Sequence, residues 1–326
     1  MKIEPNSRIR HYVARVGIFL ITSAFICGML GCGADGGNNP PPASQNLEIS
    51  TWYDLNEVRN NLAGNHTLMN DLDSSSPGYD ELASPAANSG KGWQPLLTED
   101  KSFVGTFDGQ GYEIRDLFIN RPDENEVGLF GVVDEYWGST KCYGVIKNVG
   151  VVNATVTGFD NVGGLVGASV GTVSNCYSTG NVTGRHMVGG LAGTTGTSVS
   201  NCYSAGNVTG TDKVGGLVGE NIYGGIVDRS YSTCSVTGNV TAYTYVGGLV
   251  GYNWEASVTN SFWDIESSGQ PHSGGGTGKN TTEMQDITTF SGAGWNIIAV
   301  ALNETNPAYI WNIVNNVTYP FLSWQS

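Results

Sequence analysis

The sequence predicts an all-β fold, a parallel β-helix (β-solenoid) of about five coils with a mixed N-terminal cap and an aromatic C-terminal cap. Three observations predict it. The hexapeptide VGGLxG recurs at Val162, Val188, Val214 and Val246, a second apolar element follows each copy, and glycine bounds the apolar runs. The first three copies are 26 residues apart, and the fourth follows after 32. A fixed period of this length is typical of chains that stack one small unit.

Each unit has the composition of strands. Its apolar runs are short and rich in Val, Tyr and Thr, and glycine recurs every four to six residues, which would cost about 1 kcal/mol each inside a helix. We expect three strands per unit, which read VGGLVG, TVSNCYS and GNVTG in the first copy. Three strands and three corners fit one coil of a parallel β-helix, whose strands pair with the next coil at about 4.8 Å.

Stacking would align equivalent residues in columns that no single coil could bury alone. One predicted core column consists of Leu165, Leu191, Leu217 and Leu249. Strict alternation along a strand would put Leu165 and Val166 on opposite faces, unless a corner lies within the glycine pair.

An aromatic column is the candidate binding feature of the repeats. It consists of Tyr177, Tyr203, Tyr231 and Phe262. These rings either form a packed core stack or a solvent-facing ladder on which a ligand stacks.

Residues 1–31 have the composition of a lipoprotein-type signal peptide. Four basic residues precede the mostly apolar stretch Val16–Leu30, which is short for a membrane span. The stretch ends in Gly31-Cys32, which resembles the bacterial lipoprotein box, although Met29-Leu30 departs from its usual residues. We expect lipidation at Cys32 and membrane contact through that lipid. Ordinary cleavage or an uncleaved anchor are the alternatives.

The next segments are a linker and an N-terminal cap. Residues 32–46 are rich in Gly, Pro and Asn and predict a flexible spacer. Residues 47–126 do not follow the repeat and predict a cap and the first coil. Within them, residues 52–62 have helical spacing behind a Ser50 or Thr51 cap, and His66–Leu72 suggests a strand. Asp108-Gly109 indicates a turn between two strand-like runs.

Residues 127–264 contain the repeats, and residues 265–326 contain a loop and the C-terminal cap. Gln270–Asn280 reads as the loop, and Thr282–Phe290 predicts a short helix. Large apolar side chains then gather near the end of the sequence. They predict a hydrophobic plug over the last coil, with an aromatic binding site as the alternative.

Composition excludes some partners. The chain has 29 acidic against 15 basic residues, a formal net charge of −14, and this balance argues against nucleic acid. No CxxC motif or Cys/His cluster is present, so we expect no structural metal and no cofactor. Cys176 and Cys202 occupy equivalent positions, which favours stacked buried thiols over a disulfide, and Cys142 and Cys234 remain open.

The sequence has no recognised catalytic motif. None of the four histidines lies in HExxH, and no P-loop is present. Residues 167–171 (GASVG) match the letters of GxSxG, but they lie within the repeat and not at a strand-to-helix turn. Carboxylates that could act on a polysaccharide would have to converge on one face. We expect the acids near the coils to lie at different coil positions, without a shared column. They are Asp160, Asp212, Glu220, Asp228 and Asp264.

The repeat resembles a known motif. VGGLVG followed by GTVSNCYSTGNVTG is similar to the GLUG motif of bacterial and archaeal surface proteins. The segment FDGQGYEIRDLFIN and the closing YIWNIV and YPFLSW segments resemble the flanks common in such proteins. The resemblance covers roughly residues 50–326. Members include adhesin-like proteins, and the motif also occurs beside the peptidase domain of some immunoglobulin-A-type metallopeptidases. The resemblance implies surface display and adhesion, and it carries over no catalytic residue.

Together these observations predict an exported, non-enzymatic surface protein, either an outer membrane lipoprotein or a secreted one. We expect it to bind an unidentified surface ligand, a glycan or a protein. A polysaccharide lyase or glycosidase, or a carbohydrate-binding module, on the same scaffold is the alternative. Because the repeated residues serve packing, we expect specificity where the repeat fails, at Asn221–Gly225, at Asn239–Tyr245 and in the caps.

Overall fold

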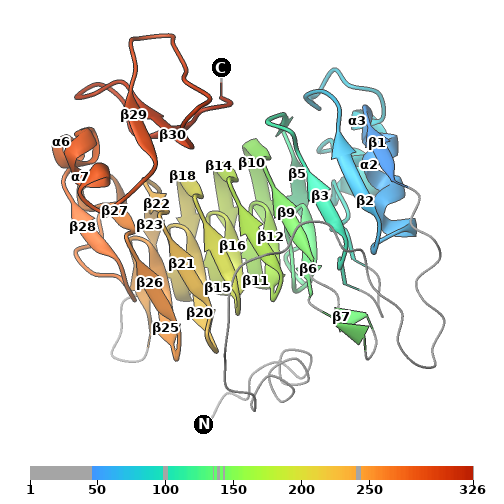
Figure 1. The fold of residues 1–326 in the computed structure, drawn as a ribbon. Helices are drawn as coiled ribbons and strands as arrows, with labels where there is room; N and C mark the ends of the chain where they lie inside the picture. Colours follow the sequence, from blue (N-terminus) through green and yellow to red (C-terminus); the bar gives the residue numbers. More distant parts are fainter. Residues whose placement is uncertain are drawn as a thin grey trace. The chain divides into compact units, whose positions relative to one another are not determined.

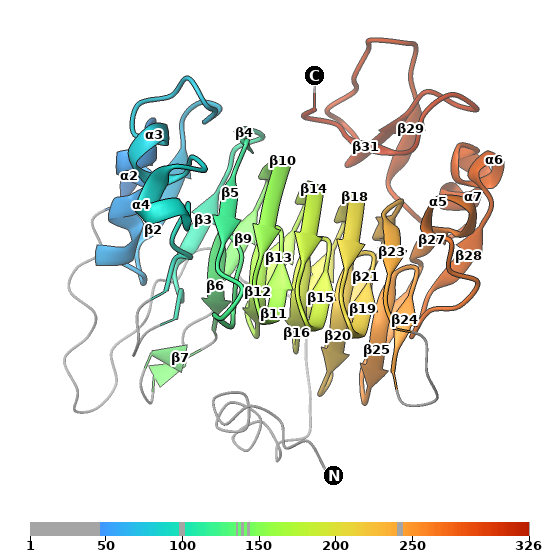
Figure 2. The ribbon, with the colours of Figure 1, turned by 180° about the vertical axis from the view of Figure 1, so that it is seen from behind.

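The computed structural model describes residues 46–97, 102–134, 136–137, 140–141, 144–239 and 244–325. Four parallel sheets wind around one axis, and the repeat coils contribute to each sheet in turn (Figures 1 and 2). The predicted parallel β-helix is confirmed. The predicted signal peptide, Cys32 and most of the linker lie outside the described residues, as does Cys142.

Sheet 1 and sheet 2 are the longest. The strands of sheet 1 are β1 (Leu47–Ile49), β2 (Asn65–Leu68), β3 (Thr106–Asp108), β9 (Val145–Lys147), β13 (Thr172–Ser174), β17 (Ser198–Ser200), β21 (Ile226–Asp228) and β26 (Ser257–Thr259). The strands of sheet 2 are β4 (Glu113–Arg115), β5 (Phe118–Asn120), β10 (Gly150–Thr157), β14 (Tyr177–Thr183), β18 (Tyr203–Thr209), β22 (Tyr231–Ser232), β23 (Ser235–Thr237), β27 (Phe262–Asp264) and β28 (Thr277–Lys279).

Sheet 3 and sheet 4 complete each coil. The strands of sheet 3 are β11 (Asp160–Gly163), β15 (His186–Gly189), β19 (Asp212–Gly215) and β24 (Val246–Gly247). The strands of sheet 4 are β6 (Phe130–Val133), β12 (Val166–Ser169), β16 (Ala192–Thr195), β20 (Val218–Ile222) and β25 (Val250–Trp254). The five strands of sheet 4 match the predicted number of coils, and β1 and β2 extend sheet 1 further at the N-terminal end.

The coils that begin at β11, β15 and β24 have four strands each, whereas the sequence predicted three. The coil that begins at β19 has five, because β22 and β23 both belong to sheet 2. The VGGLxG element is not one strand, because β11 ends at Gly163 and β12 begins only at Val166. A Cβ atom on Gly163 would lie 2.3 Å from the carbonyl oxygen of Val166, so this tight corner requires glycine. Since the corner interrupts the alternation, Leu165 and Val166 are both fully buried.

The core consists of in-register columns of apolar side chains. All four members of the predicted leucine column are fully buried, at 0% exposure. In sheet 3, Val162, Val188 and Val214 pair in register and are equally buried. The 26-residue period therefore places like residues on like residues, as a solenoid requires.

The N-terminal cap is mixed, as predicted. Its short helices are α2 (Trp52–Glu57), the 3₁₀ helix η1 (Val58–Asn60), α3 (Tyr79–Leu82) and α4 (Ala87–Gly90). Thr51 caps α2, because its side chain accepts a hydrogen bond from the amide of Asp54, which in turn accepts from the amide of Thr51. The predicted turn at Asp108-Gly109 is a corner of the coil, since β3 belongs to sheet 1 and β4 to sheet 2.

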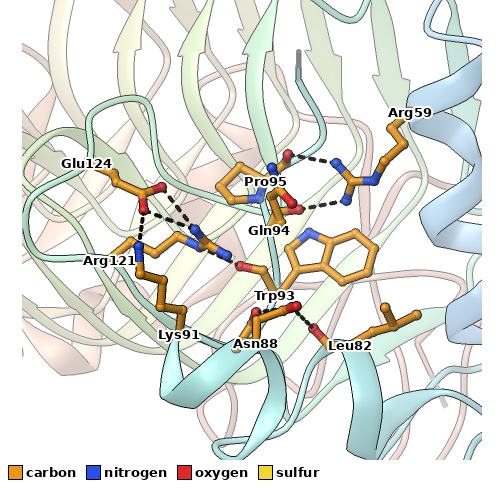
Figure 3. A network of polar contacts seen from close by, with 10 residues as sticks. Arg59, Leu82, Asn88, Lys91, Trp93, Gln94, Pro95, Arg121 and Glu124 are labelled. Atoms are coloured by element: carbon orange, nitrogen blue, oxygen red, sulfur yellow. Dashed lines mark hydrogen bonds and ion pairs between the residues drawn. The ribbon is translucent and has the colours of Figure 1, made fainter. Parts of the chain in front are cut away.

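A network of polar contacts holds this cap around Trp93 (Figure 3). The buried guanidinium of Arg121 donates to the carbonyl oxygen of Trp93 at 3.0 Å and to both oxygens of Glu124 at 3.0 Å. Lys91 adds a second ion pair to Glu124 at 2.9 Å. Arg59 lies over the Trp93 ring, 5.6 Å from its centre. Burial, followed by the charge of Arg121, lowers the pKa of Arg59.

The C-terminal part lies against the outer face of sheet 2 rather than over the last coil (Figures 1 and 2). It consists of α5 (Ile265–Ser268), α6 (Thr281–Met284), α7 (Ile287–Ser291), β29 (Ile297–Ala299), β30 (Trp311–Ile313) and β31 (Phe321–Leu322). The predicted helix over Thr282–Phe290 is two helices, because Asp286 caps a new one. The loop after α5 covers the last coil instead. There, the backbone carbonyl oxygen of His272 accepts a hydrogen bond from the amide of Gly248.

Two further observations complete the fold. Strands β7 (Tyr136–Trp137) and β8 (Thr140–Lys141) form a small antiparallel pair outside the coils. Within the part of the chain that the structure describes, no helix is both long and apolar enough to span a membrane.

Candidate functional site

The predicted aromatic column is a buried stack. The rings of Tyr177 and Tyr203 lie 4.7 Å apart and nearly parallel, and those of Tyr203 and Tyr231 lie 5.0 Å apart. All four members of the column, Phe262 included, are at most 8% exposed. They are therefore not a solvent-facing ladder in this structure.

The stack lies outside the solenoid core. Its rings belong to a second apolar cluster, which they form with the C-terminal part, and Ser178, the neighbour of Tyr177, faces inward instead. The hydroxyl of Tyr231 donates to the carbonyl oxygen of Pro320 at 2.5 Å, and Gln325 donates to the hydroxyl of Tyr203 at 2.7 Å. Burial raises the pKa of Tyr231 well above its usual range. These contacts fix the C-terminal part and leave the stack no open face for a ligand.

Two of the acids near the coils share a register column, which the sequence analysis did not expect. Asp160, His186 and Asp212 lie in one register column on β11, β15 and β19, which corrects the expectation that no column is shared. The spacing of 26 residues between them could have revealed it. The imidazole Nδ1 of His186 lies 3.2 Å from Oδ1 of Asp160, and Nε of Arg185 lies 3.6 Å from the same oxygen.

The two acids of this column are not neighbours. His186 lies between Asp160 and Asp212, so two coil spacings, about 9.6 Å, separate their backbones. Both carboxylates also have protein partners, because Asp212 accepts from the amide of Tyr245 at 2.9 Å. The column therefore orders the corners of the coils.

The remaining candidate acids are structural. Asp228 accepts from Thr259 and Asn260 and pairs with Arg229. Asp264 is fully buried and caps α5. Among the described residues, no group of three or more His, Cys, Asp or Glu side chains could hold a metal ion. Three cysteines, Cys176, Cys202 and Cys234, are buried free thiols.

An exposed aromatic surface lies elsewhere, on the last two coils. We call Tyr223, Tyr245, Tyr252 and Trp254 the aromatic surface. Tyr245 is 47% exposed and Trp254 is 41% exposed, whereas Tyr223 and Tyr252 are half-buried. Two of the four residues come from the insertions that break the repeat, where the sequence predicted specificity.

Strand β25 organises this surface. Tyr252 and Trp254 are two residues apart and project from the same face of the strand. Asn253 lies between them and accepts a hydrogen bond from the fully buried Asn221 at 2.8 Å, which anchors the strand from the core side. The ring of Tyr223 meets Trp254 edge-on at 4.8 Å, and Tyr245 lies 4.5 Å from Tyr252. The surface thus consists of two aromatic pairs along one strand.

Charged groups surround the two pairs. The ammonium of Lys213 lies 4.9 Å from the centre of the Tyr252 ring and pairs with the nearly buried carboxylate of Glu220. Glu255 follows Trp254 and is exposed. Partial burial, then the charges of Glu220 and Glu255, raise the pKa of Tyr223, so its hydroxyl remains a hydrogen-bond donor.

The backbone at this surface is strained at three non-glycine positions. Lys213, Tyr223 and Glu255 have φ values of 54°, 53° and 50°. The left-handed region costs such residues about 1–2 kcal/mol. Asn161, whose side chain tolerates this conformation, occupies the position of Lys213 two coils earlier. Met187, with a φ of 54°, occupies it one coil earlier, so the conformation at Lys213 belongs to this corner of the coil.

Comparison with known proteins identifies the repeat. The model of the GLUG motif matches residues 160–183, 184–209 and 242–262. Halomucin of Haloquadratum walsbyi is 35% identical over 150 residues, which are 44% of this chain and 2% of halomucin. A Gly-rich protein of Evansella cellulosilytica, provisionally named a membrane protein, is 35% identical over 132 residues, which are 39% of this chain and 14% of that protein. The chain therefore matches only a small part of each relative.

A solved structure shares the fold. A protein of Bacteroides ovatus, provisionally named an immunoglobulin A1 protease, superposes with a TM-score of 0.54 at 18% sequence identity. The match covers 86% of this chain and 92% of that one. At this level of identity, the likeness supports a common architecture and transfers no activity.

Proposed function

Because this chain is a GLUG-motif repeat protein, we propose that it is a non-enzymatic cell-surface protein that acts in adhesion or in contact with the envelope or matrix. The aromatic surface is its ligand-binding region. One observation carries this proposal: Trp254 and Tyr245 are exposed on coils whose other apolar side chains mostly form the core. Exposed aromatic clusters of this kind mark interaction sites.

Location at the cell surface has separate support. One relative is named halomucin and the other is provisionally named a membrane protein. The apolar segment before Cys32 has the composition of an export signal. We propose that a lipid on Cys32 tethers the protein to the outer membrane, with secretion as the alternative. Labelling cells with a radioactive fatty acid tests the tether, and equal labelling of the Cys32→Ser variant would contradict it.

Ligand binding is tested with the purified protein on arrays of glycans and matrix proteins. We expect binding that Trp254→Ala weakens and that Tyr53→Ala, an exposed tyrosine 48% accessible on α2, leaves unchanged. A polysaccharide-degradation assay runs beside the arrays. Release of sugar by the wild-type protein would overturn the non-enzymatic assignment, and binding that Trp254→Ala leaves intact would overturn the role of the aromatic surface.

A further inference from the structure

The aromatic surface has a form that restricts its ligand. Tyr252 and Trp254 are separated by two residues of an extended strand, about 6.6 Å. Each has a second aromatic ring against it, so the rings are fixed in place before a ligand arrives. Preformed rings reduce the ordering cost of binding. Two fixed platforms at this spacing suit an extended ligand with flat apolar faces that repeat along its length.

The electrostatics of the surface disfavour an anionic ligand. The ammonium of Lys213, which lies over the Tyr252 ring, is already paired with Glu220. Glu255 adds an exposed negative charge, and the chain as a whole has a formal net charge of −14. Like charge repels a polyanion over about 8 Å at physiological ionic strength. These charges therefore disfavour an acidic ligand.

The polar groups of the aromatic surface suit a ligand that carries hydroxyl groups. The Glu255 carboxylate accepts hydrogen bonds, and charge-assisted bonds of this type are the stronger ones. The hydroxyl groups of Tyr223, Tyr245 and Tyr252 both donate and accept. A sugar presents apolar C–H faces to the rings and hydroxyl groups at its rim, so both kinds of group on this surface would be satisfied together.

We propose that the aromatic surface binds a neutral polysaccharide, whose sugar rings stack on Trp254 and Tyr252 and whose hydroxyl groups bond to the flanking carboxylate and tyrosines. This inference rests on the proposed function, because it names the ligand class of that same surface. A protein partner would use the same aromatic residues, and the experiment distinguishes it.

The purified chain is titrated with a neutral glucan, a neutral mannan and an acidic polyuronate, and binding is followed by tryptophan fluorescence and by retardation in affinity gels. We expect at least one neutral polysaccharide to bind and the polyuronate not to bind. Trp254→Ala should weaken binding about tenfold, the factor that about 1.4 kcal/mol produces. Trp254→Phe should restore part of it, and Tyr53→Ala should bind as the wild type does.

The outcomes separate the two proposals. Thermal melting of each variant checks folding, and an exposed position such as Trp254 should leave the melting temperature nearly unchanged. If only the polyuronate binds, or if a matrix protein binds through Trp254 while no neutral polysaccharide does, the present inference fails and the proposed function stands. If neither glycans nor matrix proteins bind, both fail.

Discussion

Leu217→Ala tests the solenoid core most directly. Leu217 is fully buried, and its backbone is bonded on both sides, donating to Leu249 at 2.9 Å and accepting from Leu191 at 3.0 Å. Leucine-to-alanine changes in cores cost about 2–5 kcal/mol, depending on how far the site can collapse. These backbone hydrogen bonds hold both neighbouring coils in place, so the cavity cannot collapse far. We therefore expect a loss of about 4 kcal/mol in the free energy of unfolding, in the upper half of that range.

The assay is urea and thermal unfolding followed by circular dichroism. For a domain of this size 1 kcal/mol shifts the melting temperature by about 2 °C, so the variant should melt about 8 °C lower. Leu302→Ala is the matched control, because Leu302 is 66% exposed. It should change the free energy of unfolding by less than about 0.5 kcal/mol. If both variants melt with the wild type, the stacked core is refuted.

Three further predictions concern buried groups. Burial lowers the pKa of His66, whose Nδ1 has no partner among the described residues. Stability should be full above about pH 6.5 and fall by up to about 1.4 kcal/mol per pH unit below it, because the unfolded chain takes up the proton first. His66→Phe should flatten this dependence in urea unfolding at pH 7.5 and 5.5, and exposed His272→Gln should not. Arg121→Met should cost about 2–4 kcal/mol in urea unfolding, because it leaves the buried carbonyl oxygen of Trp93 without its donor and removes the ion pair to Glu124. Lys91, which is 56% exposed, should cost under about 1 kcal/mol when it is replaced in Lys91→Met; equal losses would contradict the network. Burial raises the pKa of Cys234 to about 11, so a thiol reagent at pH 8 should label it only after unfolding, and rapid labelling of the native protein would contradict this.

The period of the sequence was sufficient to predict the core. Equivalent residues such as Leu165 and Leu191 share one environment in every coil, so spacing alone identifies the columns. The number of strands per coil could not be predicted. Whether Gly163-Gly164 continues a strand or turns depends on how closely the backbone of the next coil approaches, and that approach is a tertiary contact.

The burial of the aromatic column also could not be predicted from the sequence pattern. Alternation along β14 places Tyr177 outward, and an outward aromatic column reads as a ligand platform. Only the structure shows that residues 80 or more positions later, such as Trp311 and Pro320, cover the stack. Distant segments of this kind leave no local signal in the strand that they bury.

Comparison of the columns nevertheless separates residues that serve packing between coils from residues that do not. Inward columns must repeat, because each side chain packs on its copy in the next coil. An outward column has no such constraint. The stacked tyrosines repeat and are covered by the C-terminal part, whereas Thr183, Thr209 and Thr237 repeat in register and stay exposed. The column that ends in Tyr252 does not repeat, since Ala168, Thr194 and Glu220 precede it in register. Packing between coils therefore does not determine the residues of this column, and binding of a ligand at the aromatic surface would explain why an aromatic residue stands at its end. Tyr252→Thr should therefore weaken binding in the fluorescence titration and leave the melting temperature nearly unchanged, and unchanged binding would contradict this reading of the column.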